Sequence, residues 1–393
     1  MMDLYGNRDL LEQREERRED VLRRELLEDL RERPEISDEE LLREIDRKIL
    51  GRGGYLPLEE KRRLRRTLMD SLRGMDVLQP YLDDDTVTEI MVNGPDNIFV
   101  ERRGKIERAP VRFAGEDRLL EVIRSVVAPL DRSVNRLQPI ADARLADGSR
   151  LHVVLPPAAV DAPCVTIRKF GAVPLTMEDL IRGGSLTREA AEYLKAAVRR
   201  RESIFISGGT GSGKTTFLNA LSAYIPPEER VITIEDSAEL SLQEMPNLVR
   251  LEARNENASG GREITIRELL RASLRMRPDR IIVGEVRGAE ALDMLQAMNT
   301  GHEGSLSTGH ANSPADMLSR LETMAMMGAD LPVAAIRSQI ASALRLLVHL
   351  ARGADGGRRV MRICRVRGVK EGTVWLEDVF CCGEEGLSPV SPL

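Results

Sequence analysis

The chain has 393 residues, of which 42% are hydrophobic and 31% are charged, and its formal net charge is −6. This composition predicts a soluble protein with two or three domains, and it argues against broad, non-specific binding of nucleic acid. The first thirty residues are densely charged, which is not typical of a signal peptide, and the longest apolar runs are too short to span a bilayer. We therefore expect a cytoplasmic protein without direct membrane insertion, which reaches the inner membrane only through partners.

The cysteines show no spacing that suits a metal site. None of the four is part of a C-x-x-C motif, and two of them are adjacent; they are Cys164, Cys364, Cys381 and Cys382. We expect reduced thiols and no structural zinc.

The first part of the chain, residues 1–75, is expected to be a helical extension. One helical pattern runs from residue 8 to about 33, a capping box at Ser37 and Glu40 opens a second helix, and a third runs from Pro57 to about Leu72. Two interpretations remain open. The extension is either a small bundle with a solvated charged face, or a docking module for a partner or a neighbouring subunit.

Residues 76–170 predict a small α+β domain. Short strands are expected at 87–93 and 98–101, a helix at 116–127, and further strands between 141 and 167. A linker is expected at residues 171–175.

Residues 176–393 alternate between helix and strand, which predicts an α/β domain with a parallel sheet. Buried strands are expected at 203–206, 230–234 and 280–283, and helices at 188–199, 265–276, 289–298, 314–327 and 332–344. The tail from Val360 to Phe380 predicts a β-hairpin with its turn at Glu371-Gly372. In open α/β sheets, ligands bind at the carboxyl ends of the parallel strands.

The motif G-x-x-x-x-G-K-[ST] occurs where the first of these strands meets a helix. In such a P-loop, glycines let backbone N–H groups converge on phosphate oxygens, the lysine reaches the β- and γ-phosphates, and the following hydroxyl binds Mg²⁺. The predicted nucleotide-binding residues are Gly208, Gly209, Thr210, Gly211, Ser212, Gly213, Lys214, Thr215 and Thr216. We expect ATP and Mg²⁺ as the cofactors.

Acidic residues follow two of the other predicted strands. Hydrolysis of a γ-phosphate needs such groups to hold Mg²⁺ and to orient or deprotonate a water molecule. Glu235 is the candidate base and Glu285 supports Mg²⁺ and water, and the predicted metal ligands are Thr215, Glu285, Glu235 and Asp236.

Two of the four histidines of the chain, His302 and His310, lie in one segment rich in Gly, Ser and Thr after the second acidic strand. Their position suggests that they sense the γ-phosphate or couple hydrolysis to movement. They do not suit a metal site, because no third ligand follows at a suitable spacing.

Several motifs together carry a resemblance to a known family. Besides the P-loop they are Val87–Gly94, Asp147–Arg150, Thr166–Phe170, Ile234–Asp236, Pro278–Gly288, and the histidine segment Thr300–Asn312. From about Asp83 to Leu347 the sequence resembles the ATPases of type II and type IV secretion and of type IV pili, and within them the CpaF-type ATPases of Tad (Flp) pilus assembly.

The resemblance implies a homohexamer, with ATP bound between a PAS-like N-terminal domain and a RecA-like P-loop domain. It implies that Glu285 is the Walker B glutamate, that Glu235 and Asp236 form the Asp box, and that His302 and His310 form the His box. It also implies that two arginines of the N-terminal domain, Arg150 and Arg168, approach the phosphates. The roles of Arg271 and Arg275 stay open.

The expected function is therefore a Mg²⁺-dependent motor ATPase that powers Tad-type pilus assembly or retraction by acting on platform proteins of the inner membrane. A type IV secretion traffic ATPase is the alternative within the same family. A nucleic-acid translocase and a nucleotide-gated regulator are alternatives from other classes, and we expect no nucleic-acid partner.

Overall fold

The computed structural model describes residue 19 and residues 21–30, 33, 36–51, 56–102, 104–128, 134–169, 175–242, 245–254, 262–353, 356–383 and 386–390. The chain divides into two compact units, Met1–Gly171 and Ala172–Leu393. Residues 171–174 of the predicted linker and residues 8–18 of the first predicted helix lie outside the described residues. The predicted boundary at residue 75, inside the first unit, stays a prediction.

The helices of the first unit form a small core of their own. Residues 21–30 are helical and are followed by α2 (Asp38–Gly51) and α3 (Leu58–Arg73). The capping box that opens α2 is confirmed, since the backbone N–H of Glu40 donates to Ser37 Oγ at 3.3 Å and the N–H of Ser37 donates to Glu40 Oε2 at 3.2 Å. Leucine and isoleucine residues at helical spacing pack together in this core, which contains Leu22, Leu26, Leu41, Ile45, Ile49, Leu64 and Leu68.

The rest of the first unit is a six-stranded antiparallel sheet with the order β3-β2-β1-β6-β5-β4. Its elements are η1 (Asp76–Leu78), α4 (Gln79–Leu82), β1 (Val87–Asn93), β2 (Ile98–Arg102), β3 (Lys105–Arg108), α5 (Glu116–Val127), β4 (Ile140–Arg144), β5 (Arg150–Val154) and β6 (Cys164–Arg168). Glu121 of α5 accepts hydrogen bonds from Arg23 at 2.8 Å and from Arg118 at 3.0 Å. The helix at 21–30 is therefore tied to α5 through one carboxylate.

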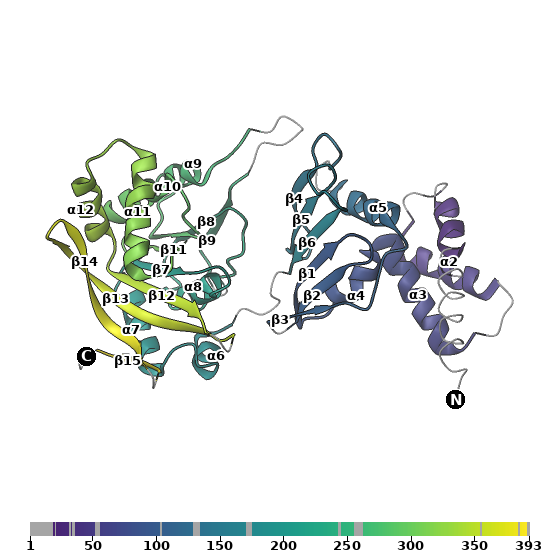
Figure 1. Cartoon of the computed structure of the whole chain (residues 1–393), viewed down its shortest axis with the longest axis horizontal. Coiled ribbons are helices and arrows are strands. Elements are labelled where there is room, and N and C mark those ends of the chain that lie inside the picture. Colours follow the sequence, from purple (N-terminus) through teal and green to yellow (C-terminus); the bar gives the residue numbers. More distant parts are fainter. Residues whose placement is uncertain are drawn as a thin grey trace. The chain divides into compact units, whose positions relative to one another are not determined.

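A nine-stranded sheet forms the centre of the second unit, with the order β15-β14-β13-β12-β7-β11-β10-β8-β9 (Figure 1). Its strands are β7 (Ile204–Gly208), β8 (Val231–Glu235), β9 (Leu248–Glu252), β10 (Arg280–Val283), β11 (Leu306–His310), β12 (Leu346–Arg352), β13 (Arg358–Lys370), β14 (Thr373–Gly383) and β15 (Gly386–Pro389). The strands from β12 to β9 pair in parallel, whereas β13, β14 and β15 are antiparallel. The predicted hairpin of the tail is confirmed, but the sheet is mixed rather than parallel throughout, because that hairpin extends it beyond β12.

Helices cover both faces of this sheet. They are α6 (Met177–Arg182), α7 (Arg188–Arg199), α8 (Lys214–Ser222), α9 (Ile266–Ser273), α10 (Glu290–Asn299), α11 (Pro314–Gly328) and α12 (Val333–Ala343). Because strand residues alternate between faces, Ile204 and Ile206 of β7 join the core beside α6, α7 and α8, while Phe205 joins the core beside α9 to α12. All five residues of β7 are buried, and β7 is the middle strand in the order of the nine-stranded sheet.

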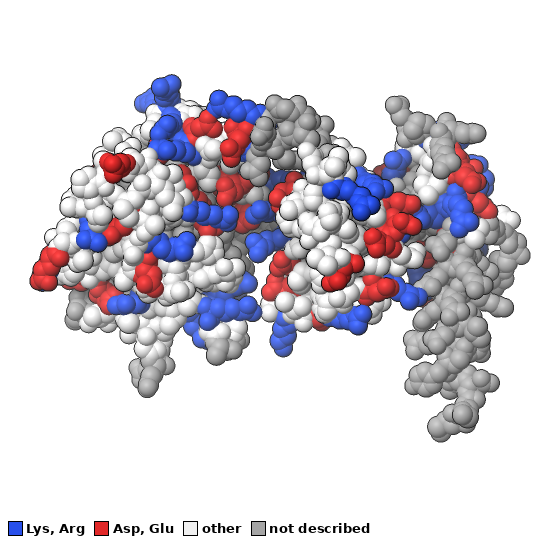
Figure 2. Space-filling view, turned by 45° about the horizontal axis from the view of Figure 1, so that its top comes forward, with Lys and Arg blue, Asp and Glu red and all other residues white. Residues whose placement is uncertain are grey.

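Charges of both signs are interspersed over the face drawn in Figure 2. None of the described helices is long and apolar enough to cross a membrane.

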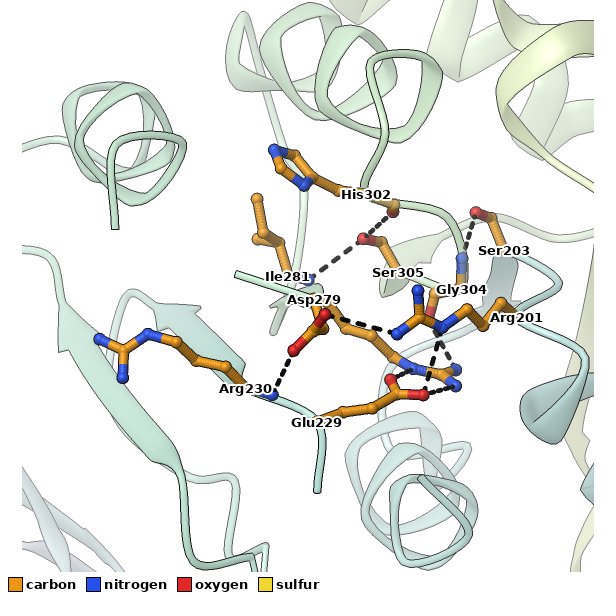
Figure 3. A network of polar contacts seen from close by, with 10 residues as sticks. Arg201, Ser203, Glu229, Arg230, Asp279, Ile281, His302, Gly304 and Ser305 are labelled. Atoms are coloured by element: carbon orange, nitrogen blue, oxygen red, sulfur yellow. Dashed lines mark hydrogen bonds and ion pairs between the residues drawn. The ribbon is translucent and has the colours of Figure 1, made fainter. Parts of the chain in front are cut away.

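An ion pair is buried at the amino ends of the parallel strands in the second unit (Figure 3). Arg280, at the start of β10, is fully buried, and its guanidinium donates to Glu229 at 2.5 and 3.2 Å and to the carbonyl of Gly304 at 3.3 Å. Arg201 donates to the same carboxylate at 3.2 Å. A Cβ on Gly304 would lie 2.7 Å from Arg280, which explains the glycine at this position, where φ is +79°.

We expect Glu229→Gln to destabilise the second unit by roughly 3–5 kcal/mol, because it leaves the Arg280 guanidinium buried without a counter-charge. The control is Glu377→Gln, whose partner Arg367 and whose own side chain are both about half exposed; it should cost at most ~1 kcal/mol. Urea unfolding of the full-length variants measures both effects. Equal stabilities of the two variants would contradict the prediction.

Candidate functional site

The P-loop connects the central strand to a helix. β7 ends at Gly208, residues 209–213 form the loop, and α8 begins at Lys214, with Thr215 and Thr216 in its first turn. A Cβ on Gly209 or on Gly211 would meet no atom within 4 Å, so the space above the loop is open. Free backbone N–H groups at a helix N-terminus attract anions. This geometry forms a cradle for phosphate groups.

Lys214 folds over this loop. Its Nζ donates hydrogen bonds to the carbonyl oxygens of Gly208 at 3.1 Å and Gly209 at 2.8 Å. The side chain is largely buried, and burial lowers the pKa of Lys214 although the nearby Glu285 carboxylate opposes that shift. A phosphate anion in the cradle would supply the counter-charge that offsets this loss of hydration.

A line of polar contacts runs from Lys214 to Glu285. Nδ1 of His310 lies 3.3 Å from Nζ of Lys214, and Nε2 of the same ring lies 2.9 Å from Oε1 of Glu285. Burial lowers the pKa of His310, so the neutral ring is favoured. Glu285 is also paired with Arg287, whose guanidinium lies 2.9 Å from Oε2.

The two acidic residues after β8 have different surroundings. Glu235 is buried, and its Oε2 accepts hydrogen bonds from the backbone N–H groups of Glu239 at 2.8 Å and Leu240 at 2.9 Å. Burial raises the pKa of Glu235 to about 7, although these hydrogen bonds oppose the shift. Asp236 is exposed and lies 3.4 Å from Arg287.

The strand order brings these residues to one edge of the sheet. β11 lies beside β7, β10 follows and β8 comes next. His310 is in register with Gly208, Glu285 follows the end of β10, and Glu235 ends β8. Three strand spacings separate β7 from β8, or roughly 14 Å at ~4.8 Å each. Glu285 is therefore nearer to the P-loop than Glu235, and Glu235 and Asp236 suit contacts through water better than direct ligation of a metal at the phosphates.

His302 does not lie at this edge. It precedes β11, whose first residue, Leu306, is in register with Ile204 at the start of β7. Its carbonyl accepts a hydrogen bond from Ser305 Oγ at 2.7 Å, and that Oγ accepts one from the backbone N–H of Ile281 at 3.1 Å (Figure 3). Within this unit, β11 runs parallel to β7 and its length separates His302 from His310, so the role predicted for His302 stays a prediction.

Arg150 and Arg168 belong to the first unit. Arg150 begins β5, Arg168 ends β6, and the two residues are directly opposite each other in the antiparallel pair. Two arginines that are separated in the sequence thus meet at one end of the sheet.

The sequence did not reveal two sets of contacts near the P-loop, one made by His349 and one made by Arg287. His349 of β12 is buried, and its Nδ1 lies 2.9 Å from Oγ of Ser207, the residue before Gly208. Its pattern, one histidine in an apolar strand, carries no signal of function. Arg287 links Glu285 to Asp236, and only the fold shows that these carboxylates share one guanidinium.

Arg271, whose role was open, pairs with the largely buried Asp293 at 2.9 Å, as Arg267 does at 2.6 Å. This contact gives Arg271 a structural partner on α10.

The donor set fits Mg²⁺ bound together with a nucleotide. Oε1 of Glu235 is buried and has no hydrogen-bond partner, and the Thr215 hydroxyl lies in the first turn of α8. Within the described part of the chain, no group of three or more His, Cys, Asp or Glu side chains could hold a metal alone. Mg²⁺ commonly takes only one or two protein oxygens and completes its shell with phosphates and water.

Comparisons with known proteins show which family this chain is similar to. The family model described as "Type II/IV secretion system protein" matches residues 71–377. A Mycobacterium tuberculosis (strain H37Rv) protein whose name assigns it provisionally to conjugal transfer is 38% identical, over 80% of this chain and 91% of its own length. The type IV secretion system protein VirB11 of Brucella suis is 34% identical, over 72% of this chain and 86% of its own length.

Among solved structures, the Legionella pneumophila ATPase DotB matches with a TM-score of 0.53 at 22% identity, over 73% of this chain and 79% of that one. This last similarity concerns the α/β fold alone. On the match over residues 71–377 and on these identities, the chain belongs to the family of type II/IV secretion system proteins.

Proposed function

We propose that this chain is the motor ATPase of a secretion or pilus machine, which hydrolyses Mg²⁺-ATP at the P-loop edge of its second unit. The chain is an ATP hydrolase of the type II/IV secretion family. One observation supports the site above all, namely the contiguous contacts of Lys214, His310 and Glu285 beside the open loop.

In this proposal the loop N–H groups and the N-terminus of α8 bind the β- and γ-phosphates, and Lys214 leaves its carbonyl partners to pair with them. Bound Mg²⁺ supplies charge neutralisation between the phosphates; Thr215 would hold it directly, with Glu285 beside it and Glu235 and Asp236 acting through water. His310 connects Lys214 to Glu285 and can report the charge at the γ-phosphate. The role of His302 is coupling at the opposite edge of the sheet.

Glu235 suits the role of general base. Burial raises the pKa of its carboxyl group to about 7, close to neutral pH, and Oε1, which has no hydrogen-bond partner, can accept a proton from water. Glu285 is a weaker candidate for the base, because its Oε2 is paired with Arg287 at 2.9 Å, although its Oε1, like that of Glu235, has no hydrogen-bond partner.

The finer assignments follow the sequence resemblance. We propose a cytoplasmic homohexamer that acts on platform proteins of the inner membrane, with a PAS-like domain at residues 76–170 after the helical extension. The machine is either a Tad (Flp) pilus or a type IV secretion system. The name of the Brucella suis relative favours the second candidate.

Deletion of the gene in its host distinguishes the two machines. Loss of surface pili supports the Tad assignment, whereas loss of substrate export or of conjugation, with pili unchanged, supports the traffic ATPase. Each phenotype should be restored by the wild-type gene and not by a gene encoding Lys214→Ala.

Purified protein is expected to release phosphate from ATP only when Mg²⁺ is present, and Lys214→Ala should remove nearly all turnover, because the developing phosphoryl charge loses its cation. A phosphate-release assay with and without EDTA measures this. Wild-type turnover in the lysine variant would show that the site is misassigned.

The rate constant kcat/KM should rise as the pH increases from about 6 to 8, because Glu235 has a raised pKa of about 7 and acts as a base only when deprotonated. Glu235→Gln should lower kcat/KM by roughly two orders of magnitude and remove this limb of the profile. The control is Glu252→Gln, because Glu252 is exposed and is the residue of β9 in register with Glu235. An unchanged profile in Glu235→Gln would assign the base elsewhere.

Arg150→Ala and Arg168→Ala should fold and bind nucleotide but lose most hydrolysis, if these arginines offset charge on the γ-phosphate in the assembled ring. Arginine fingers contribute about 10³–10⁵ in rate in other phosphoryl-transfer systems. Lys105→Ala, on the exposed strand β3, is the control. Full activity of both arginine variants, or full activity of a monomeric preparation, would disprove a site shared between domains.

A further inference from the structure

The P-loop strand has a neighbour on the side away from the acids. β11 flanks β7 on one side, and β10, which precedes Glu285, lies beyond it. β12 flanks β7 on the other side, with Leu350 in register with Gly208. When the loop holds the β-phosphate, the γ- and α-phosphates extend from it in opposite directions. A γ-phosphate beside His310 and Glu285 therefore leaves the α-phosphate and the nucleoside on the side of β12 and β13.

Arg358 lies on that side, against the loop. It is the first residue of β13 and is directly opposite Arg352, the last residue of β12. A Cβ built on Gly213 would lie 3.2 Å from Cδ of Arg358 and 3.8 Å from its Cβ. Gly213 is the residue immediately before α8. The aliphatic part of Arg358 thus packs on the last residue of the phosphate cradle.

The side of β13 to which Arg358 points is consistent with its contact with Gly213. Val360, two residues after Arg358, is fully buried in the same core as Phe217 and Leu218 of α8. Residues two apart point to the same face of a strand. Arg358 therefore faces the P-loop helix, whereas the next residue, Arg359, faces the other side of the sheet.

The guanidinium of Arg358 is available to a ligand. The residue is exposed, and it forms no side-chain hydrogen bond or ion pair with any residue that the structure describes. A planar guanidinium offers a fixed fork of donors to a phosphate.

We propose that Arg358 binds the α-phosphate of the nucleotide and so makes the C-terminal hairpin β13–β14 part of the nucleotide site. This inference rests on the proposed ATP site. The α-phosphate is common to ATP and ADP, and it does not change during transfer of the γ-phosphate. Arg358 should therefore contribute equally to the binding of both nucleotides and little to the chemical step.

Equilibrium binding of Mg²⁺-ATP and Mg²⁺-ADP tests the proposal, with the wild type, Arg358→Ala, Arg359→Ala and Lys214→Ala compared by calorimetry. Arg358→Ala should raise both dissociation constants by roughly tenfold or more, as expected for the loss of a hydrogen bond to a charged group. Its kcat at saturating ATP should stay within about twofold of the wild type, as uniform binding predicts. Arg359→Ala is the matched control, with the same change of charge one residue away on the opposite face, and it should bind like the wild type.

Three results would overturn this inference alone: wild-type affinities in Arg358→Ala, a loss for ATP but not for ADP, or an equal loss in Arg359→Ala. If the wild type binds neither nucleotide, or if Lys214→Ala binds both as well as the wild type does, the proposed ATP site fails and the role of Arg358 fails with it. Thermal unfolding of each variant checks that the fold is intact.

Discussion

The burial of β7 on both faces is the constraint on which the second unit depends. All five of its residues are buried, with Ile204 and Ile206 in one core and Phe205 in the other. Parallel neighbours on both sides satisfy its backbone and hold its carboxyl end in place. Because that end is Gly208, the phosphate cradle begins on a strand that is buried throughout. A loop supported in this way can bind a charged ligand with little reorganisation.

The charged groups at the amino ends of the parallel strands differ from those at the carboxyl ends. At the amino ends, Arg280 and Glu229 form a buried, fully charged pair, and Gly304 makes room for it. At the carboxyl ends, Lys214, His310 and Glu285 form a partly buried line that faces the open loop. The first group has its counter-charges inside the protein, whereas the second has space for a ligand to complete it. His302 lies before β11, on the side of the first group, and His310 ends β11 beside the second.

Burial also separates the roles of the two glutamates. Glu285 lies between His310 and Arg287, each 2.9 Å from one of its carboxylate oxygens. Glu235, one strand further from the P-loop, is desolvated, and the pKa of its carboxyl group is raised to about 7. Two side chains of the same chemistry thus become an electrostatic anchor and a candidate base, through their surroundings alone.

The sequence by itself determined the local features: the P-loop between a strand and a helix, the capping box at Ser37, helix α5, which matches the predicted range, and the family. These depend on residues close together in the chain, whose spacing carries the signal. Tertiary structure alone decided the order of the strands, and with it which distant residues meet: His310 with Lys214, Arg150 opposite Arg168, and Arg358 against Gly213. It also decided that His302 and His310 lie toward opposite ends of β11, and that burial raises the pKa of Glu235. Strand direction and desolvation both arise from neighbours that are far away in the sequence.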